Sequence, residues 1–423
     1  MQAGVPSGDP KPLPQKPSIR ILETRLVQDP GSEGLLLLDP EGLFEDPVYV
    51  PQGLLPVLAS FDGERTLTQI AEKLGQDFGQ TVPLEFVQQV VRDLDERLCL
   101  EGERVEAMRR QAQLDFASLE SRPAIHAGSS GYPEAGPECD RAMDDLLGEP
   151  RGLRHETPLL GLVAPHIDLR RGARGYREAY ERLRQHPPSD LYILFGTSHQ
   201  GGATSLIPFR KPFDTPLRRV ETDTAFIERF LDGLGPDGGL SKSLDEEMLH
   251  LREHSLEFQV LFLAKVLGDH PFRIVPFLTG SLPDRPAEDS AIARQLDVLT
   301  ELVCQYPGRV SFIAGADLSH LGPMFGDPEP VDDELLANLE DLDRGSLDFV
   351  LQGRPAEFYA HVHDEGNPRR ICGSAPVFYV TELSRRLDPE CRAELLHYGQ
   401  SVAADHSQVV THASLVLQGK ALP

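Results

Sequence analysis

Histidines stand at the ends of three short apolar runs in this sequence. His166 follows the run 159–164, His199 follows "DLYILFGTS", and His320 follows "RVSFIAGADLS", which also carries Asp317. A single histidine in such a place usually donates a structural hydrogen bond. Three of them at the ends of neighbouring strands would converge, because the carboxyl ends of parallel strands meet at one edge of a sheet. The sequence therefore predicts a cleft lined by imidazoles.

Two further segments add side chains that can bind metal or move protons. "EHSLE" places Glu253, His254 and Glu257 at the start of a predicted helix, and "ICGSAP" places Cys372 at a predicted turn. Each has a plainer interpretation: carboxylates stabilise helix N-termini, and a cysteine is often a small buried hydrophobic residue. Imidazole and thiolate both bind first-row transition metals, so two histidines and one cysteine would suit iron(II) or copper, and zinc less well.

Asp317 and His320 add acid–base chemistry to this metal hypothesis. They are close in sequence, so the carboxylate could tune the imidazole as a proton acceptor. A hydrolytic alternative stays open, in which zinc-bound water attacks an ester or amide. Nucleotide binding and serine hydrolysis lack support, because the sequence has no G-x-G-x-x-G, P-loop or G-x-S-x-G motif.

The elements that must position these residues begin near residue 127, where apolar strand patterns alternate with helical ones. This alternation predicts an α/β domain over 127–423, with a mixed, mainly parallel sheet flanked by helices. Residues 19–101 combine short strand patterns with amphipathic helices and predict a small α+β, winged-helix-like domain. The Pro- and Gly-rich residues 1–18 predict a disordered tail, and 102–126 a charged linker helix.

The composition of the chain limits which classes of partner and which cellular compartment are expected. The 423 residues include 41 basic and 67 acidic ones, a formal charge of −26. Repulsion of this size disfavours nucleic acids and anionic membranes as partners. No stretch resembles a signal peptide or a membrane span. The five cysteines are scattered and form no C-x-x-C pair, which favours free thiols in a reducing cytoplasm.

One histidine-rich segment is interpreted as a decoy. "HVHDEGN" offers His361 and His363 beside two acidic residues. Its polar, glycine-containing sequence predicts a surface loop that does not contribute to the metal site.

A resemblance to a known family rests on several motifs in a fixed order. From residue 127 to near the C-terminus the chain carries "AGSSGYP", "APHIDLRRGA", "FGTSHQGG", "EHSLEFQ", "GADLSHLG", "ICGSAP" and "LLHYGQS". This series resembles the Memo family, whose bacterial and archaeal members are called AmmeMemoRadiSam system protein B. The family is similar in fold to the class III extradiol dioxygenases, and its members are described as binding iron or copper.

The resemblance implies a role for each candidate residue. His166, His199 and Cys372 align with the family's metal ligands. His320 aligns with the acid/base histidine of the dioxygenases, with Asp317 and His254 beside it in the pocket. The dioxygenases have a carboxylate where Cys372 stands here, so ordinary ring cleavage is not the expected reaction.

Residues 19–101 resemble PqqD-like peptide-recognition domains. Together with the resemblance of residues 127–423, this leaves two classes of function. In the first, the chain is an iron- or copper-dependent oxidoreductase, dioxygenase-like, acting on an unknown small molecule or peptide. In the second, it is a non-catalytic scaffold that binds metal or peptide and works with a radical-SAM partner, a partner that the family's name implies. Oxygen consumption by the iron-loaded protein would discriminate between them.

Overall fold

The computed structural model describes residues 13–27, 31, 33–44, 46–129, 131–152, 154–157, 159–202, 204–235 and 244–419. The predicted tail at 1–18 therefore lies mostly outside the described residues. The chain divides into two compact units, residues 1–118 and residues 119–423. Within the described ranges, no helix is both long enough and apolar enough to cross a membrane. All five cysteines are free thiols.

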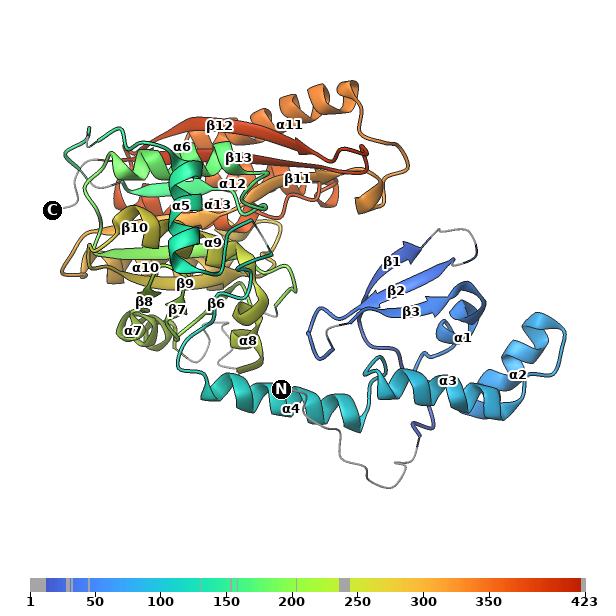
Figure 1. The fold of residues 1–423 in the computed structure, drawn as a ribbon. Helices are drawn as coiled ribbons and strands as arrows, with labels where there is room; N and C mark the ends of the chain where they lie inside the picture. The colour runs from blue at the N-terminus through green and yellow to red at the C-terminus, as the bar shows by residue number, and fades with distance from the viewer. Residues whose placement is uncertain are drawn as a thin grey trace. The chain divides into compact units, whose positions relative to one another are not determined.

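The first unit is a three-stranded antiparallel sheet with helices (Figure 1). Its strands run in the order β1-β2-β3, so β3 is an edge strand. Thr66 caps α2: its hydroxyl accepts from the Gln69 backbone N–H, and the Gln69 side chain accepts from the Thr66 N–H. The elements are β1 (Glu23–Val27), β2 (Gly34–Leu38), β3 (Val48–Pro51), η1 (Gln52–Leu54), α1 (Leu55–Leu58), α2 (Leu67–Phe78), α3 (Leu84–Glu96) and α4 (Glu103–Ser118).

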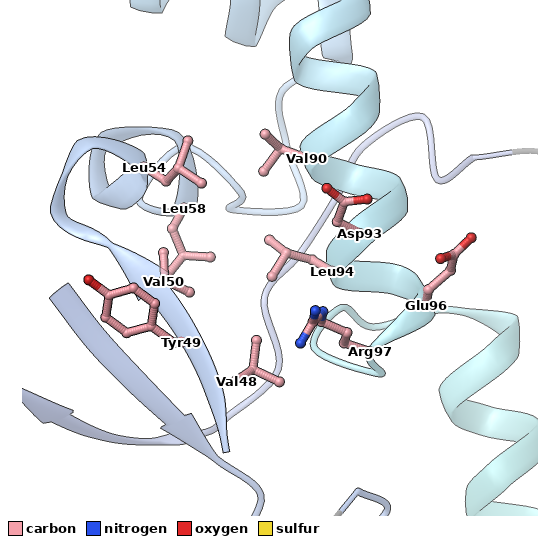
Figure 2. Close-up of a pocket in the computed structure, with 10 residues that line it drawn as sticks. All are labelled: Val48, Tyr49, Val50, Leu54, Leu58, Val90, Asp93, Leu94, Glu96 and Arg97. Atoms are coloured by element: carbon pink, nitrogen blue, oxygen red, sulfur yellow. The ribbon is translucent and has the colours of Figure 1, made fainter. Parts of the chain in front are cut away.

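A pocket of about 350 Å³ lies between β3 and α3 in this unit (Figure 2). Apolar side chains from both elements and from η1 and α1 face it, while Asp93, Glu96 and Arg97 stand on the side of α3. The pocket is lined by Val48, Tyr49, Val50, Leu54, Leu58, Val90, Asp93, Leu94, Glu96 and Arg97.

The second unit is built on an eight-stranded mixed sheet. Its order is β11-β13-β4-β10-β5-β9-β6, with β12 paired to β13. The four central strands β4, β10, β5 and β9 are parallel, and the other pairings are antiparallel. The strands are β4 (Gly161–Ala164), β5 (Leu191–Thr197), β6 (Leu206–Pro208), β9 (Arg273–Thr279), β10 (Val310–Gly315), β11 (Asp317–Leu321), β12 (Arg392–Val402) and β13 (Val409–Gln418), with a separate pair β7 (Phe213–Asp214) and β8 (Arg219–Val220).

Helices cover both faces of this sheet, which is why its central strands are mainly apolar. Phe195 on β5 stacks on Tyr379 of α13, whereas the next residue, Gly196, faces Ser255 and Leu256 of α9. The helices are α5 (Gly136–Leu147), α6 (Ala173–Arg184), α7 (Thr224–Leu234), α8 (Leu244–Arg252), α9 (His254–Leu267), η2 (Pro286–Glu288), α10 (Ser290–Cys304), η3 (Pro323–Phe325), α11 (Asp333–Leu351), α12 (Pro355–His363), η4 (Asp364–Gly366) and α13 (Ser374–Leu387).

These features confirm the predicted fold class: a mixed, mainly parallel sheet flanked by helices, with a small antiparallel sheet in the N-terminal unit. Two local expectations differ from the structure. The segment with His361 and His363 is the end of helix α12, where the two rings bond Ser346 and Ser374. The long hairpin of β12 and β13, which completes the sheet, was not predicted.

Candidate metal centre

His166 lies directly after β4 and is almost completely buried. Its backbone N–H donates to Asp317 Oδ1 at 3.0 Å, and its ring Nδ1 is 2.9 Å from the carbonyl oxygen of Gly315, the last residue of β10. A carbonyl oxygen can only accept, so Nδ1 carries a hydrogen. The other ring nitrogen, Nε2, is left for the site.

His199 follows β5 and is held in the same manner by a carboxylate. Glu253 Oε2 accepts from the His199 backbone N–H at 2.9 Å, and Oε1 lies 3.0 Å from Nδ1. Glu253 is also the N-cap of α9, where it accepts from the backbone N–H of Ser255. The start of α9 thus fixes the tautomer of His199, and Nε2 is again the nitrogen available to a ligand.

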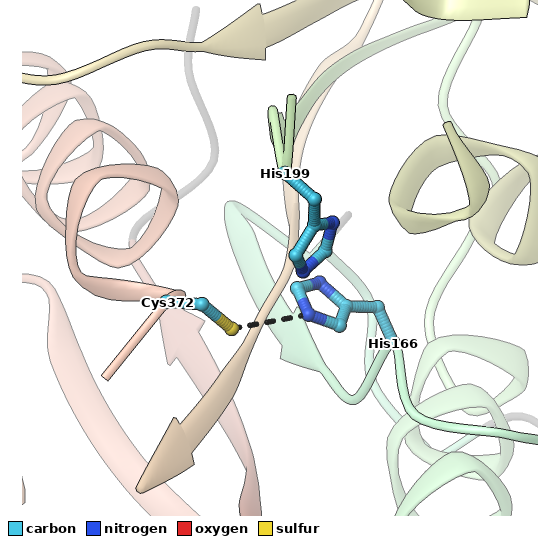
Figure 3. A group of neighbouring side chains, drawn as sticks. All are labelled: His166, His199 and Cys372. Atoms are coloured by element: carbon cyan, nitrogen blue, oxygen red, sulfur yellow. Dashed lines mark hydrogen bonds between the residues drawn. The ribbon is translucent and has the colours of Figure 1, made fainter. Parts of the chain in front are cut away.

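Cys372 completes a group of three, as predicted (Figure 3). It lies in the turn before α13, and its Sγ is 3.2 Å from His166 Nε2. Ligand atoms of His166, His199 and Cys372 all lie within 4.8 Å of one another. Two Nε2 atoms with their Nδ1 atoms bonded, beside one thiol, suit the binding of a transition-metal cation. The predicted ligands are therefore brought together by three segments far apart in sequence.

A second group of possible ligands, His199, Glu253 and His254, overlaps the first. Its carboxylate already accepts hydrogen bonds from the His199 ring and from two backbone N–H groups. Glu253 is therefore explained as the residue that orients His199, a role that the sequence did not reveal. The only signal was its place directly before a predicted helix.

Charge couples Cys372 to the two imidazoles. Burial alone would raise the pKa of the Cys372 thiol, but the positive charge of His166 and hydrogen bonds from His166 and His199 lower this pKa to about 5. Burial likewise opposes the charged form of His166, and the Cys372 thiolate raises the pKa of this histidine to about 9. At neutral pH the side chains alone therefore form a thiolate–imidazolium pair.

The predicted acid–base residues surround this group in different ways. The carboxylate of Asp317 contacts His166, with Oδ2 at 3.7 Å from Nε2. The ring of His320 instead bonds the carbonyl oxygen of Leu318 through Nδ1 at 3.0 Å, and its charge contributes to lowering the Cys372 pKa. Asp317 is thus placed to act on the candidate ligand His166, whereas the sequence had paired it with His320.

His254 opens α9 and stacks on His199, with ring centroids 4.8 Å apart and planes 14° apart. Its ring is also 5.4 Å from that of His166. Burial lowers the pKa of His254 to about 3, although Glu253 opposes this shift. His254 is therefore neutral at neutral pH, beside both candidate imidazole ligands.

A buried hydrogen-bond network, which the sequence did not predict, lies at the first turn of α9 next to His254. Arg122 is fully buried and donates to Glu257 Oε2 at 2.6 Å and to the backbone carbonyl of Glu253 at 2.7 Å. Glu257 also bonds Tyr132 and the ring and backbone of His126. These contacts join residues about 130 positions apart and hold the first turn of α9 in place. They therefore fix the positions of Glu253 and His254 at the start of this helix.

Comparisons with known proteins find relatives that match most of this chain. A family model described as "Memo-like protein" matches residues 122–416. A "MEMO1 family protein" of Aquifex aeolicus is 24% identical over 406 residues, covering 95% of this chain and 99% of that protein. One from Thermus thermophilus is 27% identical over 354 residues, covering 84% and 99%. One from Methanosarcina barkeri is 28% identical over 267 residues, covering 62% and 88%.

The second unit is thus an α/β protein whose mainly parallel, helix-flanked sheet gathers two histidines at its strand ends, beside a cysteine in the turn before α13. Because the family model spans well over half of the sequence, the chain belongs to the Memo family. The resemblance stated from the ordered motifs is confirmed.

The pKa of Cys372 gives a direct test of the geometry. In metal-free protein, the rate at which iodoacetamide alkylates Cys372 should rise through about pH 5 and be flat between pH 6 and 8, because the thiolate is the nucleophile. His166→Gln removes the main favourable charge, so the rate at pH 7 should fall about tenfold. Peptide mapping by mass spectrometry measures the rate.

Cys304, an exposed cysteine on α10, is the internal control and should react equally in both proteins. A Cys372 rate that still climbs between pH 7 and 9 in the wild type would contradict the thiolate–imidazolium pair.

Proposed function

We propose that this chain binds one redox-active cation, iron(II) or copper, through His166, His199 and Cys372, and acts as an oxidoreductase on an unidentified small molecule or peptide. The observation that carries the proposal is the hydrogen bonding of both imidazoles. Each Nδ1 is bonded to an acceptor, so each Nε2 is directed to the side where Sγ lies. Imidazole and thiolate together suit iron and copper, with zinc a weaker alternative.

The bound cation would supply electron-transfer chemistry toward dioxygen or an oxidisable substrate. The chain's own residues would hold and move protons. His320 donates from Nδ1 to Leu318, which leaves Nε2 as the proton acceptor. His254, neutral because burial lowers its pKa, would be a second acceptor beside His199. Asp317 would keep His166 in place by accepting the hydrogen bond of the His166 backbone N–H.

A thiolate ligand distinguishes this proposal from ring-cleaving dioxygenases. Thiolate is softer than carboxylate and is itself oxidised by peroxide. A reducing cytoplasm would protect Cys372, which is consistent with five free cysteines in the chain. The expected reaction is therefore metal-dependent oxidation without cleavage of an aromatic ring.

Elemental analysis is the first test of the site. Protein purified without added metal or chelator should contain about one iron or copper per chain. His166→Ala, His199→Ala and Cys372→Ser should each reduce metal occupancy at least about tenfold. A site with only three protein ligands has little affinity for metal once one of them is removed. Inductively coupled plasma mass spectrometry gives the ratio of metal to protein.

The matched controls are His155→Ala and Cys304→Ser, which remove the same ligand types outside the site and should keep full occupancy. Full occupancy in all three site variants would sink the ligand assignment. So would a wild-type chain that takes up no metal after anaerobic loading with iron(II) or copper(I).

Oxygen uptake distinguishes an enzyme from a metal-binding scaffold. Iron-loaded protein should consume dioxygen with an oxidisable probe such as catechol faster than free iron(II) does. His320→Gln should lower this rate about 100-fold while metal occupancy stays unchanged, because it removes the proton acceptor without removing a ligand. An oxygen electrode follows the reaction, and His155→Gln is the control.

Uptake equal to that of free iron, with full and tight occupancy, would instead favour the non-catalytic scaffold. Equal rates in wild type and His320→Gln would remove His320 from the mechanism but leave the ligands standing.

A second candidate function concerns residues 19–101, which we propose act as a separate recognition domain joined by the linker 102–126, which contains α4, to the α/β domain 127–423. The pocket between β3 and α3 favours an extended peptide as its occupant (Figure 2). The outer edge of β3 can pair with an added strand, while apolar side chains such as Val50 and Val90 receive alternate side chains of that strand.

Charge selects among peptides. Asp93 and Glu96 line the pocket beside a single Arg97, so basic residues between the apolar ones would be favoured. The same acidic residues argue against nucleic acid as the occupant. Delivery of such a peptide to a radical-SAM partner, the partner that the family name implies, would fit this proposal.

A charge reversal tests the pocket. A fluorescently labelled 12-residue peptide of alternating Val and Lys should bind the full chain more tightly than its Val–Glu counterpart. Asp93→Lys should weaken binding of the Val–Lys peptide about two- to fivefold, the size expected for one partly exposed ion pair. Fluorescence anisotropy measures both affinities.

Glu85→Lys makes the same charge change in the first turn of the same helix, away from the pocket, and should not affect binding. Equal affinities for the two peptides, or equal losses in the two variants, would contradict a peptide site between β3 and α3.

A further inference from the structure

Asp343, on helix α11, is a buried carboxylate that no step above has used. It is fully buried and accepts four hydrogen bonds from four separate segments. Ser319 Oγ and Arg369 Nη1 each lie 2.6 Å from Oδ1. The hydroxyl of Tyr398 lies 3.0 Å from Oδ2, and the hydroxyl of Thr411 donates to the same oxygen. A carboxylate with both oxygens engaged in this way fixes the positions of its donors.

Two of these donors come from the segments that carry the metal centre. Ser319 stands on β11 between Asp317 and His320. Arg369 lies three residues before Cys372, and its carbonyl oxygen accepts from the His320 backbone N–H at 2.8 Å. Asp343 therefore joins the strand of the acid–base residues to the turn of the thiol ligand, although it lies outside the ligand group.

The turn before Cys372 has an unusual backbone that requires such support. Glu365, Asn367 and Arg370 have positive φ angles of 54°, 60° and 53°. Non-glycine residues adopt this region at a cost, and the conformation persists only where surrounding contacts determine it. Asn367 bonds both backbone groups of Ile371, and Arg370 pairs with Asp327 at the surface.

Arg369 supplies the buried anchor of this turn. Besides Asp343, its guanidinium donates to Ser346 Oγ at 2.6 Å, also on α11. A guanidinium left without its carboxylate in the interior would have to move toward water. The turn, and Cys372 with it, would then lose its fixed position.

The conformation of β11 depends on the same carboxylate of Asp343. The pairing of β11 with β13 shifts by one residue between Asp317 and His320, an irregularity of the β-bulge type. Residues three apart on a regular strand face opposite sides, and the bulge removes this constraint. Ser319 lies in the bulge, where its N–H donates to Thr411 Oγ1 and its hydroxyl to Asp343.

We propose that Asp343 is a positioning residue for the metal centre: its carboxylate holds Arg369 and Ser319 together and so fixes Cys372 relative to His320 and Asp317. This inference rests on the proposed metal function, which supplies its main readout. It adds a residue that no sequence motif marks.

The test compares Asp343→Asn with Tyr398→Phe, which removes a hydrogen bond from the same carboxylate without touching either site segment. Metal affinity, measured by competition with a chelator, should fall 10- to 100-fold in Asp343→Asn, the usual range for residues that orient ligands. It should change less than about threefold in Tyr398→Phe. Amide hydrogen exchange of residues 365–373, measured in metal-free protein, should be faster in Asp343→Asn alone.

Thermal unfolding separates positioning from general stability, because both variants lose a buried hydrogen bond. Unchanged metal affinity in Asp343→Asn, or equal losses in both variants, would overturn the positioning role and leave the metal proposal intact. If the wild type itself binds no metal, the proposed function fails, and hydrogen exchange alone tests the positioning role of Asp343. Equal exchange of residues 365–373 in the two variants would then overturn that role. Should Asp343→Asn not fold, Arg369→Lys and Ser319→Ala replace it, with the same expected loss of affinity.

Discussion

The parallel pairing of β4 with β10 is the constraint on which the site depends. It sets Ala164 opposite Gly315, so that the carbonyl oxygen of Gly315 meets the ring of His166 just beyond the end of β4. That one hydrogen bond determines which nitrogen of His166 is available. Position 315 requires glycine, since a Cβ there would collide with the carbonyl oxygen of Ser255 on α9. The close approach of α9 to the sheet is what brings Glu253, its N-cap, to His199.

Two buried carboxylates support the candidate metal centre through different segments. Glu253 holds His199 directly, and its pKa is kept well below the usual value by the charge and hydrogen bonds of that histidine, although burial opposes the shift. Asp343 acts at longer range through Arg369. Burying a carboxylate is costly unless donors surround it. Both carboxylates have such donors, which come from segments far apart in the sequence.

The sequence predicted the parts of this arrangement that depend on short-range patterns. Apolar runs that end in histidine identified the strand ends, and the rule that parallel carboxyl ends share one edge brought His166 and His199 together. Cys372 was placed correctly at a turn. The resemblance of ordered motifs then selected these three residues from the fourteen histidines and five cysteines of the chain.

What the sequence could not predict depends on contacts between distant segments. Nothing in the spacing of Asp343 and Arg369 indicates an ion pair, and Asp317 appeared to serve His320 because it is near in sequence. The strand β12 was missed because "RAELLHYGQSV" has no clean alternation of apolar and polar residues. It is half-exposed along most of its length and becomes a strand by pairing with the buried β13.

The replacement of a carboxylate by a thiolate has consequences for the chemistry that such a site can perform. A Cys372 thiolate paired with imidazolium is already charged at neutral pH, so a cation bound by Cys372 and His166 would displace the Nε2 proton of the imidazolium and none from the thiol. The same low pKa makes the thiolate open to oxidation when no cation protects it. A chain built in this way would function best where reductants are abundant and the cation stays bound, and its occupancy by metal would determine whether Cys372 is a ligand or a target of oxidation.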